Sequence, residues 1–320
     1  MLENIAFLFP GQGAQYTGMA VDLLSSDNVK ILFDTASDIF KRDMKEILNY
    51  DADTLKRTDV SQPAITVANL AAFIFLKDRG FTPSVCAGFS LGEYAALVCA
   101  GVINTEDCLR LIKTRGEVMQ KAADLLREES GGDASASPGM AAVVGLAPET
   151  AELLISQWRA EGLKDLYAAN INSPKQIVIS GTASALAEAE GRFKEAGAKR
   201  VIRLPVAGPF HSPLMSKAAE EFAQALSAVT FCDPVMPVFS NVTGKRISSG
   251  KEAKELAVMH ITHPVRWIDE EKEITSCGVK VCLEAGPGRV LHGLWKDSGS
   301  EIPILAAGTA EDISKLGEKE

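Results

Sequence analysis

The stretch Gly88-Phe89-Ser90-Leu91-Gly92, of the form G-x-S-x-G, constrains this chain more than any other feature. Residues 84–87 before it are typical of a short strand behind Pro83, and residues 91–100 after it are typical of a helix that Gly101 ends. Between a strand and a helix, the pattern places a serine hydroxyl on a sharp turn that faces the free N–H groups of the helix. An ordinary Gly-Ser-Gly turn is the alternative, but the strand–turn–helix context favours a nucleophile.

Apolar runs that alternate with helical patterns surround this turn. They predict strands at 5–9, 84–87, 235–239 and 279–283, and helices over 28–49, over 61–77 with Pro63 in its first turn, and over 289–295. The alternation predicts an α/β domain with a parallel sheet and helices on both faces. We assign residues 1–139 and 207–320 to this domain.

Residues 140–206 have a different order, βαββαβ. The predicted strands are 140–146, 166–170, 176–180 and 200–206, and the predicted helices are 148–160 and 183–196. This order is the split form of a ferredoxin-like unit, so we expect a small inserted subdomain. The Gly/Ser/Pro-rich segment 127–139 before it is typical of a mobile linker, and the sequence gives it no function.

A glycine-rich loop around Gln12 follows the first strand. Its main-chain N–H groups can approach a ligand, so the N–H groups of Gln12 and Leu91 are candidate donors to an oxyanion. A dinucleotide-binding fingerprint would need glycine where Tyr16 stands, and the lysine of a phosphate-binding Walker loop is absent. Nucleotide binding is therefore excluded as the role of this loop.

Arg115 lies on the apolar stripe of a helix that Asn104 caps, four residues after Leu111 and four before Met119. A guanidinium on a buried face needs a partner. One alternative is a structural ion pair with a buried acid. The other is a fork that binds a substrate carboxylate through two parallel hydrogen bonds.

His211 stands immediately before Ser212 and Pro213, which are typical of a helix start with a capping serine. The positive end of that helix would keep the imidazole neutral, as a general base requires. The alternative is a histidine that only packs. Together with Ser90, His211 indicates acyl transfer by covalent catalysis. His260 and His263 have no Cys, Asp or Glu near them in sequence, so we expect no metal site.

Composition excludes several other classes. The net charge of −9 argues against general nucleic-acid binding. The six cysteines show no C-x-x-C spacing, which favours buried free thiols in a reducing compartment. The N-terminus lacks the basic region of a signal peptide, and no apolar run approaches the length of a membrane span. We therefore expect a cytoplasmic protein that binds neither nucleic acid nor membrane.

Six motifs together resemble those of malonyl-CoA:acyl carrier protein transacylases, and the resemblance covers nearly the whole chain. They are Phe9-Pro10-Gly11-Gln12-Gly13-Ala14-Gln15, Gly88-Phe89-Ser90-Leu91-Gly92-Glu93-Tyr94, Arg115-Gly116, Gly208-Pro209-Phe210-His211-Ser212, Pro264-Val265-Arg266-Trp267 and Glu284-Ala285-Gly286-Pro287-Gly288. The family fold, an α/β-hydrolase-like domain with a ferredoxin-like insertion, agrees with the predicted pattern. The chain departs from many relatives in having Phe89 in place of histidine and His260 in place of glutamine.

The resemblance implies that Ser90 carries a malonyl ester and that His211 acts as acid and base. It also implies that the main-chain N–H groups of Gln12 and Leu91 form the oxyanion hole, and that Arg115 binds the malonyl carboxylate. Malonyl-CoA would be the substrate and a phosphopantetheinylated acyl carrier protein the partner, with no permanently bound cofactor.

Four further residues take roles from the resemblance. The main-chain carbonyl of His260 would orient the catalytic histidine, and Asn170 and Asn172 would border the pantetheine channel. Phe210 would crowd an α-methyl branch, which predicts malonyl in preference to methylmalonyl.

Three other functions stay open at this point. A discrete acyltransferase that serves a polyketide synthase would use the same chemistry with another carrier protein. A serine acyl hydrolase would not need Arg115, and a non-catalytic docking module would tolerate loss of Ser90. Lys199, Arg200 and Arg203 are candidates to meet the CoA phosphates, although solvated surface charge is the favoured explanation for them.

Overall fold

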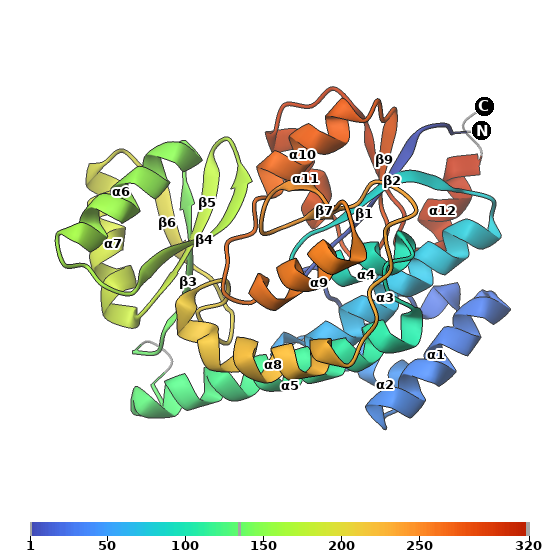
Figure 1. Cartoon of the computed structure of the whole chain (residues 1–320), viewed down its shortest axis with the longest axis horizontal. Coiled ribbons are helices and arrows are strands. Elements are labelled where there is room, and N and C mark those ends of the chain that lie inside the picture. The colour runs from blue at the N-terminus through green and yellow to red at the C-terminus, as the bar shows by residue number, and fades with distance from the viewer. Residues whose placement is uncertain (1, 134–135, 318–320) are drawn as a thin grey trace.

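A parallel sheet lies at the centre of the larger of two lobes in the computed structural model, which describes residues 2–133 and 136–317 (Figure 1). Its strand order is β10-β9-β1-β2, and each neighbouring pair is parallel. The strands are β1 (Ile5–Phe9), β2 (Pro83–Gly88), β9 (Val281–Glu284) and β10 (Ile304–Ala306). Every residue of β1 is buried, which explains its continuous apolar sequence. Phe9 pairs with Gly88, so the loop around Gln12 and the turn at Ser90 leave the same edge of the sheet.

Helices surround this sheet. They are α1 (Asp27–Phe40), α2 (Met44–Leu48), α3 (Thr58–Asp78), α4 (Gly92–Cys99), α5 (Thr105–Glu129), α8 (Ser216–Ser227), α9 (Gly250–Met259), α10 (Trp267–Ser276), α11 (Val290–Asp297) and α12 (Ala310–Gly317), with 3-10 turns η1 (Val21–Ser25), η2 (Thr54–Lys56) and η3 (Pro213–Met215). A short antiparallel pair, β7 (Phe239–Ser240) and β8 (Lys245–Arg246), completes the lobe. Figure 1 shows α8 running alongside the long helix α5.

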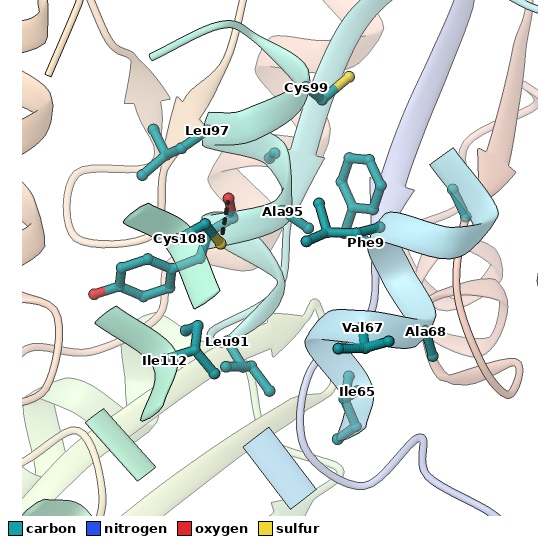
Figure 2. Packing of buried hydrophobic residues seen from close by; sticks show 14 of the residues in the cluster. Phe9, Ile65, Val67, Ala68, Leu91, Ala95, Leu97, Cys99, Cys108 and Ile112 are labelled. Atoms are coloured by element: carbon teal, nitrogen blue, oxygen red, sulfur yellow. Dashed lines mark hydrogen bonds between the residues drawn. The ribbon is translucent and has the colours of Figure 1, made fainter. Parts of the chain in front are cut away.

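The main core lies between the sheet and the helices. Figure 2 shows part of this cluster, with Phe9 of β1, Val67 of α3, Ala95 of α4 and Ile112 of α5. The thiol of Cys108 reaches a main-chain carbonyl within it. The helix that carries the nucleophile turn is thus held between β1, α3 and α5 by apolar contacts, which stabilise it more than its short length could.

Helix α3 corrects one expectation from the sequence. It is long and apolar enough to cross a membrane, although no such run was expected. Of its most apolar window, 83% is buried inside the protein, so its composition is that of a helix in a globular core.

The smaller lobe contains an antiparallel sheet in the order β4-β5-β3-β6, covered by two helices (Figure 1). Its elements are β3 (Gly139–Val144), α6 (Pro148–Ala160), β4 (Leu166–Ser173), β5 (Gln176–Gly181), α7 (Ala183–Glu195) and β6 (Arg200–Arg203). The predicted βαββαβ order is confirmed. Main-chain hydrogen bonds from Ile171 to Val265 and from Val265 to Ala169, 2.7 and 2.8 Å long, join β4 to the larger lobe.

Two predicted helices differ from the observed ones. The single helix expected over 28–49 is divided between α1 and α2, because Lys41 takes a left-handed conformation with φ 56° and Asp43 caps the second piece. The helix expected from Ser61 begins at Thr58, so Pro63 lies inside α3 rather than in its first turn.

Two other segments differ as well. The strand expected at 235–239 is reduced to β7 and to one parallel bridge between Val238 and Cys86, since Pro234 and Pro237 lack the N–H groups that a strand would donate. The predicted linker 127–139 begins inside α5, which continues to Glu129, and its residues 134–135 lie outside the described residues.

Candidate active site

The turn that carries Ser90 is strained, and two glycines make it possible. Ser90 has φ 49°, a left-handed conformation that is costly for a serine. A Cβ atom on Gly88 would lie 2.1 Å from the carbonyl of Gly92, and one on Gly92 would lie 2.0 Å from the carbonyl oxygen of Phe9. Both positions therefore require glycine, which is the physical content of the G-x-S-x-G pattern.

Ser90 meets His211 at this turn. Ser90 Oγ lies 2.8 Å from His211 Nε2, and His211 Nδ1 lies 3.1 Å from the His260 carbonyl and 3.2 Å from the His263 carbonyl. Carbonyl oxygens only accept, so Nδ1 carries the ring proton. Nε2 is then free to accept the hydroxyl proton of Ser90, which is the arrangement a general base needs.

Burial keeps His211 neutral. It lowers the pKa of His211 to about 3, with further contributions from the neighbouring His260 and Arg115. Neutrality was expected from the positive end of the following helix, whereas the largest cause is burial. Ser212 precedes the short turn η3, which continues directly into α8, but its side chain makes no cap hydrogen bond and its hydroxyl donates to the Pro209 carbonyl.

Arg115 is buried and has no acid as a direct partner. Its Nη2 lies 3.3 Å from His260 Nδ1, and its guanidinium lies over the Tyr94 ring, 5.6 Å from the centroid. Within the described part of the chain, no carboxylate forms an ion pair with it, and its Nε has no hydrogen-bond partner. The alternative of a structural ion pair is therefore wrong. Burial lowers the pKa of Arg115 and makes an incoming carboxylate a favourable partner.

One pocket of about 210 Å³ brings the predicted residues together. Ser90, His211 and Arg115 line it from the larger lobe, and Asn170 and Asn172 line it from β4. Gln12, Leu91 and Phe210 also line it. Of the predicted site residues, only His260 does not line the pocket. Its Nδ1 contacts Arg115, and its carbonyl contacts His211. None of Lys199, Arg200 and Arg203 lines the pocket.

The two predicted oxyanion donors have no acceptor within the described residues. Across residues 2–133 and 136–317, no hydrogen bond is donated by the main-chain N–H of Gln12 or of Leu91. The Ser90 N–H, in contrast, donates to Asn241 Oδ1 at 2.5 Å. The Ser90 N–H is therefore engaged, and those of Gln12 and Leu91 remain available to a ligand in the pocket.

A buried polar cluster behind the pocket was not predicted from the sequence. It consists of Glu93, Asn241, His260 and Glu270, all nearly inaccessible to solvent. Burial and the nearby Glu93 raise the pKa of Glu270 well above its usual range. Glu93 lies within the serine motif, whereas no sequence pattern marks Asn241. The described residues contain no group of three or more His, Cys, Asp or Glu side chains suited to a metal ion.

Comparison with known proteins places this geometry in context. A protein-family sequence model described as the acyl transferase domain matches residues 6–315 of the chain. The malonyl CoA-acyl carrier protein transacylase of Bacillus subtilis strain 168 is 36% identical over 314 residues, which are 98% of this chain and 96% of the relative.

Solved structures agree with the sequence match. The malonyl CoA-acyl carrier protein transacylase from Coxiella burnetii superposes with a TM-score of 0.90 at 34% identity, covering 100% of this chain and 98% of the other. A malonyl-transacylase in complex with its type II PKS acyl-carrier protein superposes with a TM-score of 0.89 at 34% identity, covering 99% of this chain and 100% of the other.

Proposed function

This chain belongs to the family of malonyl CoA-acyl carrier protein transacylases, and on that premise we propose that Ser90 carries the malonyl group during transfer. The enzyme is an acyltransferase that moves a malonyl group from malonyl-CoA to an acyl carrier protein, a step of fatty acid biosynthesis. The observation that carries the assignment of residues is the buried Arg115, which has no acidic partner and lines the same pocket as the Ser90–His211 pair.

In the first half of the reaction, His211 Nε2 accepts the proton of Ser90 Oγ as Oγ attacks the thioester carbonyl of malonyl-CoA. The main-chain N–H groups of Gln12 and Leu91 stabilise the negative oxygen of the tetrahedral intermediate. When the intermediate collapses, the carbon–sulfur bond breaks and His211 returns the proton to the CoA thiolate. Malonyl remains on Ser90 as an ester.

In the second half, the phosphopantetheine thiol of the carrier protein gives its proton to His211 Nε2 and attacks the ester carbonyl. The same N–H groups stabilise the second intermediate, and Ser90 Oγ leaves with the proton from His211. The His260 carbonyl keeps Nδ1 protonated in both halves and so fixes the tautomer. Every proton transfer passes through His211 Nε2, and the scheme requires no bound cofactor.

Arg115 selects the acyl group by binding the malonyl carboxylate. A buried guanidinium without an acid strongly favours a substrate that brings one, whereas a neutral acyl group leaves it unpaired. This residue distinguishes the proposed transferase from a serine acyl hydrolase, which has no need of a buried cation at this place. Asn170 and Asn172, which line the pocket from β4, are proposed to border the pantetheine arm.

A second candidate function is supported by one neighbour, the malonyl-transacylase in complex with its type II PKS acyl-carrier protein. The same pocket would serve a discrete acyltransferase of a polyketide synthase, with a different carrier protein as acceptor. Transfer rates to a panel of carrier proteins would separate the two.

We also infer the finer description of the fold and the location. The strand order β4-β5-β3-β6 with helices α6 and α7 supports a ferredoxin-like subdomain of residues 140–206. The nucleophile turn after β2 supports a hydrolase-like catalytic domain formed by residues 1–139 and 207–320. All six cysteines are free thiols and four are buried, which supports the reducing cytoplasm.

The test is intact-mass analysis after mixing the protein with malonyl-CoA. We expect a malonyl adduct on the wild type, none on Ser90→Ala, and release of the adduct when a phosphopantetheinylated carrier protein is added. An adduct of equal yield on Ser90→Ala would overturn the assignment, and an adduct that water releases as fast as the carrier protein does would favour a hydrolase.

A further inference from the structure

Asn241 lies directly behind the nucleophile turn and contacts both ends of it. Its Oδ1 accepts a hydrogen bond from the Ser90 N–H at 2.5 Å, and its Nδ2 donates to the Gly88 carbonyl at 2.7 Å. The side-chain amide thus bonds to the two main-chain groups that flank Phe89. Asn241 is buried but does not line the pocket, so it does not contact a substrate there.

This pattern reproduces one step of a parallel β-ladder. In such a ladder, a residue on the neighbouring strand donates to the carbonyl before its partner and accepts from the N–H after it. On the other side of the turn, β1 provides a real ladder bond, from the Phe89 N–H to the Phe9 carbonyl at 2.9 Å. The amide of Asn241 therefore substitutes for a missing strand opposite β1.

The neighbouring main chain explains why the strand is missing. Val238 forms a parallel bridge with Cys86, and the Cys86 N–H donates to the Pro237 carbonyl at 3.0 Å. If this ladder continued by two residues on both strands, the Asn241 N–H would donate to the Gly88 carbonyl. That N–H instead donates to Glu93 Oε2 at 2.8 Å. The bond to the Gly88 carbonyl is made by the side-chain Nδ2 of Asn241.

Two carboxyl groups hold the amide in position. The Asn241 Nδ2 group also donates to Glu270 Oε1 at 2.8 Å, and Glu93 holds the main chain of the same residue. His260 Nε2 lies 3.3 Å from Asn241 Oδ1, which connects the amide to the ring that contacts Arg115. The orientation of Asn241 is thus fixed from its backbone, from its Nδ2 group and from its Oδ1 atom.

We propose that Asn241 is a positioning residue for the nucleophile, which holds the strained turn at Ser90 and keeps the Ser90 N–H out of the oxyanion hole. The inference rests on the proposed role of Ser90 as the residue that is acylated. A left-handed serine persists only where its surroundings enforce that conformation. Without the amide, the turn can relax, Ser90 Oγ moves from its 2.8 Å contact with His211, and acylation slows while Arg115 still binds the substrate.

The experiment compares wild type with Asn241→Ala and Asn241→Leu by rapid-quench intact-mass analysis of the malonyl adduct. Asn241→Ala removes both bonds to the turn. Asn241→Leu keeps a similar volume but can neither accept from the Ser90 N–H nor donate to the Gly88 carbonyl. We expect acylation to slow by about 100-fold in both variants, with the half-saturating malonyl-CoA concentration within about threefold of wild type.

Phe33→Leu serves as the control, because it alters a buried side chain of α1 far along the chain from the turn. It should lower the melting temperature without slowing acylation. If Asn241→Ala does not fold, the near-isosteric Asn241→Leu provides the measurement. Acylation of either folded variant within about threefold of the wild-type rate would overturn the inference and leave the proposed function intact, whereas absence of an adduct on the wild type would overturn both.

Discussion

Arg115 Nη2 lies 3.3 Å from His260 Nδ1, so a neutral ring nitrogen is the polar partner of this buried guanidinium. Because a guanidinium only donates, Nδ1 must accept and Nε2 must carry the proton. Nε2 in turn lies 3.3 Å from Glu93 Oε2, so the ring stands between the arginine and the nearest acid. The positive charge of Arg115 is oriented by this contact but not neutralised, and it remains available to a carboxylate in the pocket.

The first prediction concerns Arg115 itself. Arg115→Ala should lower kcat/KM for malonyl-CoA by about 100-fold, since a charge-assisted hydrogen-bonded pair with the malonyl carboxylate is lost. Transfer from acetyl-CoA, which has no carboxylate, should change by less than about threefold. Steady-state rates with the two donors measure the difference. Equal losses for both donors would mean that the residue supports the fold and not the choice of acyl group.

The second prediction concerns the side chain of His260. In His260→Gln, the amide oxygen can accept from Arg115 and the amide nitrogen can donate to Glu93, so kcat/KM for malonyl-CoA should stay within about threefold of wild type. His260→Leu can do neither and should lose about tenfold. Both variants keep the main-chain carbonyl that accepts from His211, so the catalytic pair is unaffected. The ratio of malonyl to acetyl transfer reports the effect, and a ratio unchanged in His260→Leu would contradict it.

Much of this site could be predicted from the sequence because its parts are local. The G-x-S-x-G pattern reports a steric requirement that acts within five residues, since Gly88 and Gly92 leave no room for a Cβ. The position of Arg115 on an apolar stripe likewise follows from helical periodicity, and the absence of an acidic partner among the described residues supports the proposed role of Arg115.

The parts that the sequence did not predict depend on long-range packing. Asn241 reaches Ser90 across 151 residues of chain, and no local pattern marks an asparagine that replaces a strand. The neutrality of His211 was expected from a helix end, but its cause is burial, which only the folded chain determines. The strand at 235–239 was expected from its apolar composition, whereas Pro237 within it and Pro234 just before it leave one bridge and the two-residue strand β7.

The third prediction concerns the size of the acyl group. Phe210 is buried beside His211 and lines the pocket, so it should exclude an α-methyl branch. Wild type should prefer malonyl-CoA to methylmalonyl-CoA, and Phe210→Ala should shift the ratio toward methylmalonyl by about tenfold. A competition assay with both donors, read by the mass of the adduct, measures this. Equal use of the two donors by wild type would contradict the steric argument.

The fourth prediction concerns pH. Burial lowers the pKa of His211 to about 3, so the ring stays neutral, and able to accept a proton, well below the ordinary histidine pKa of about 6.5. The rate of Ser90 acylation should therefore stay constant between about pH 8 and about pH 5, and should fall only as the pH approaches the lowered pKa. Stopped-flow or rapid-quench acylation rates across this range test the expectation. A decrease centred near pH 6.5 would show that the ring titrates normally.

The fifth prediction concerns stability and Glu271, a buried acid on α10 that the catalytic scheme does not use. Burial raises the pKa of Glu271 to about 8, so the folded protein keeps a proton that the unfolded chain releases above about pH 4.5. The folded state therefore loses stability as the pH rises from about 4.5 to about 8. Glu271→Gln removes this loss, and by pH 7 it should raise the free energy of unfolding by up to about 3 kcal/mol.

The pH dependence separates this effect from a general gain in packing. Urea unfolding of wild type and Glu271→Gln should give nearly equal free energies at about pH 5 and a growing difference toward about pH 8, because only the wild type must hold a proton against the rising pH. Glu273→Gln on the same helix, at a partly exposed position, is the matched control and should show a much smaller change. A stability difference between Glu271→Gln and wild type that stays constant with pH would mean that the carboxyl of Glu271 is not held protonated by burial.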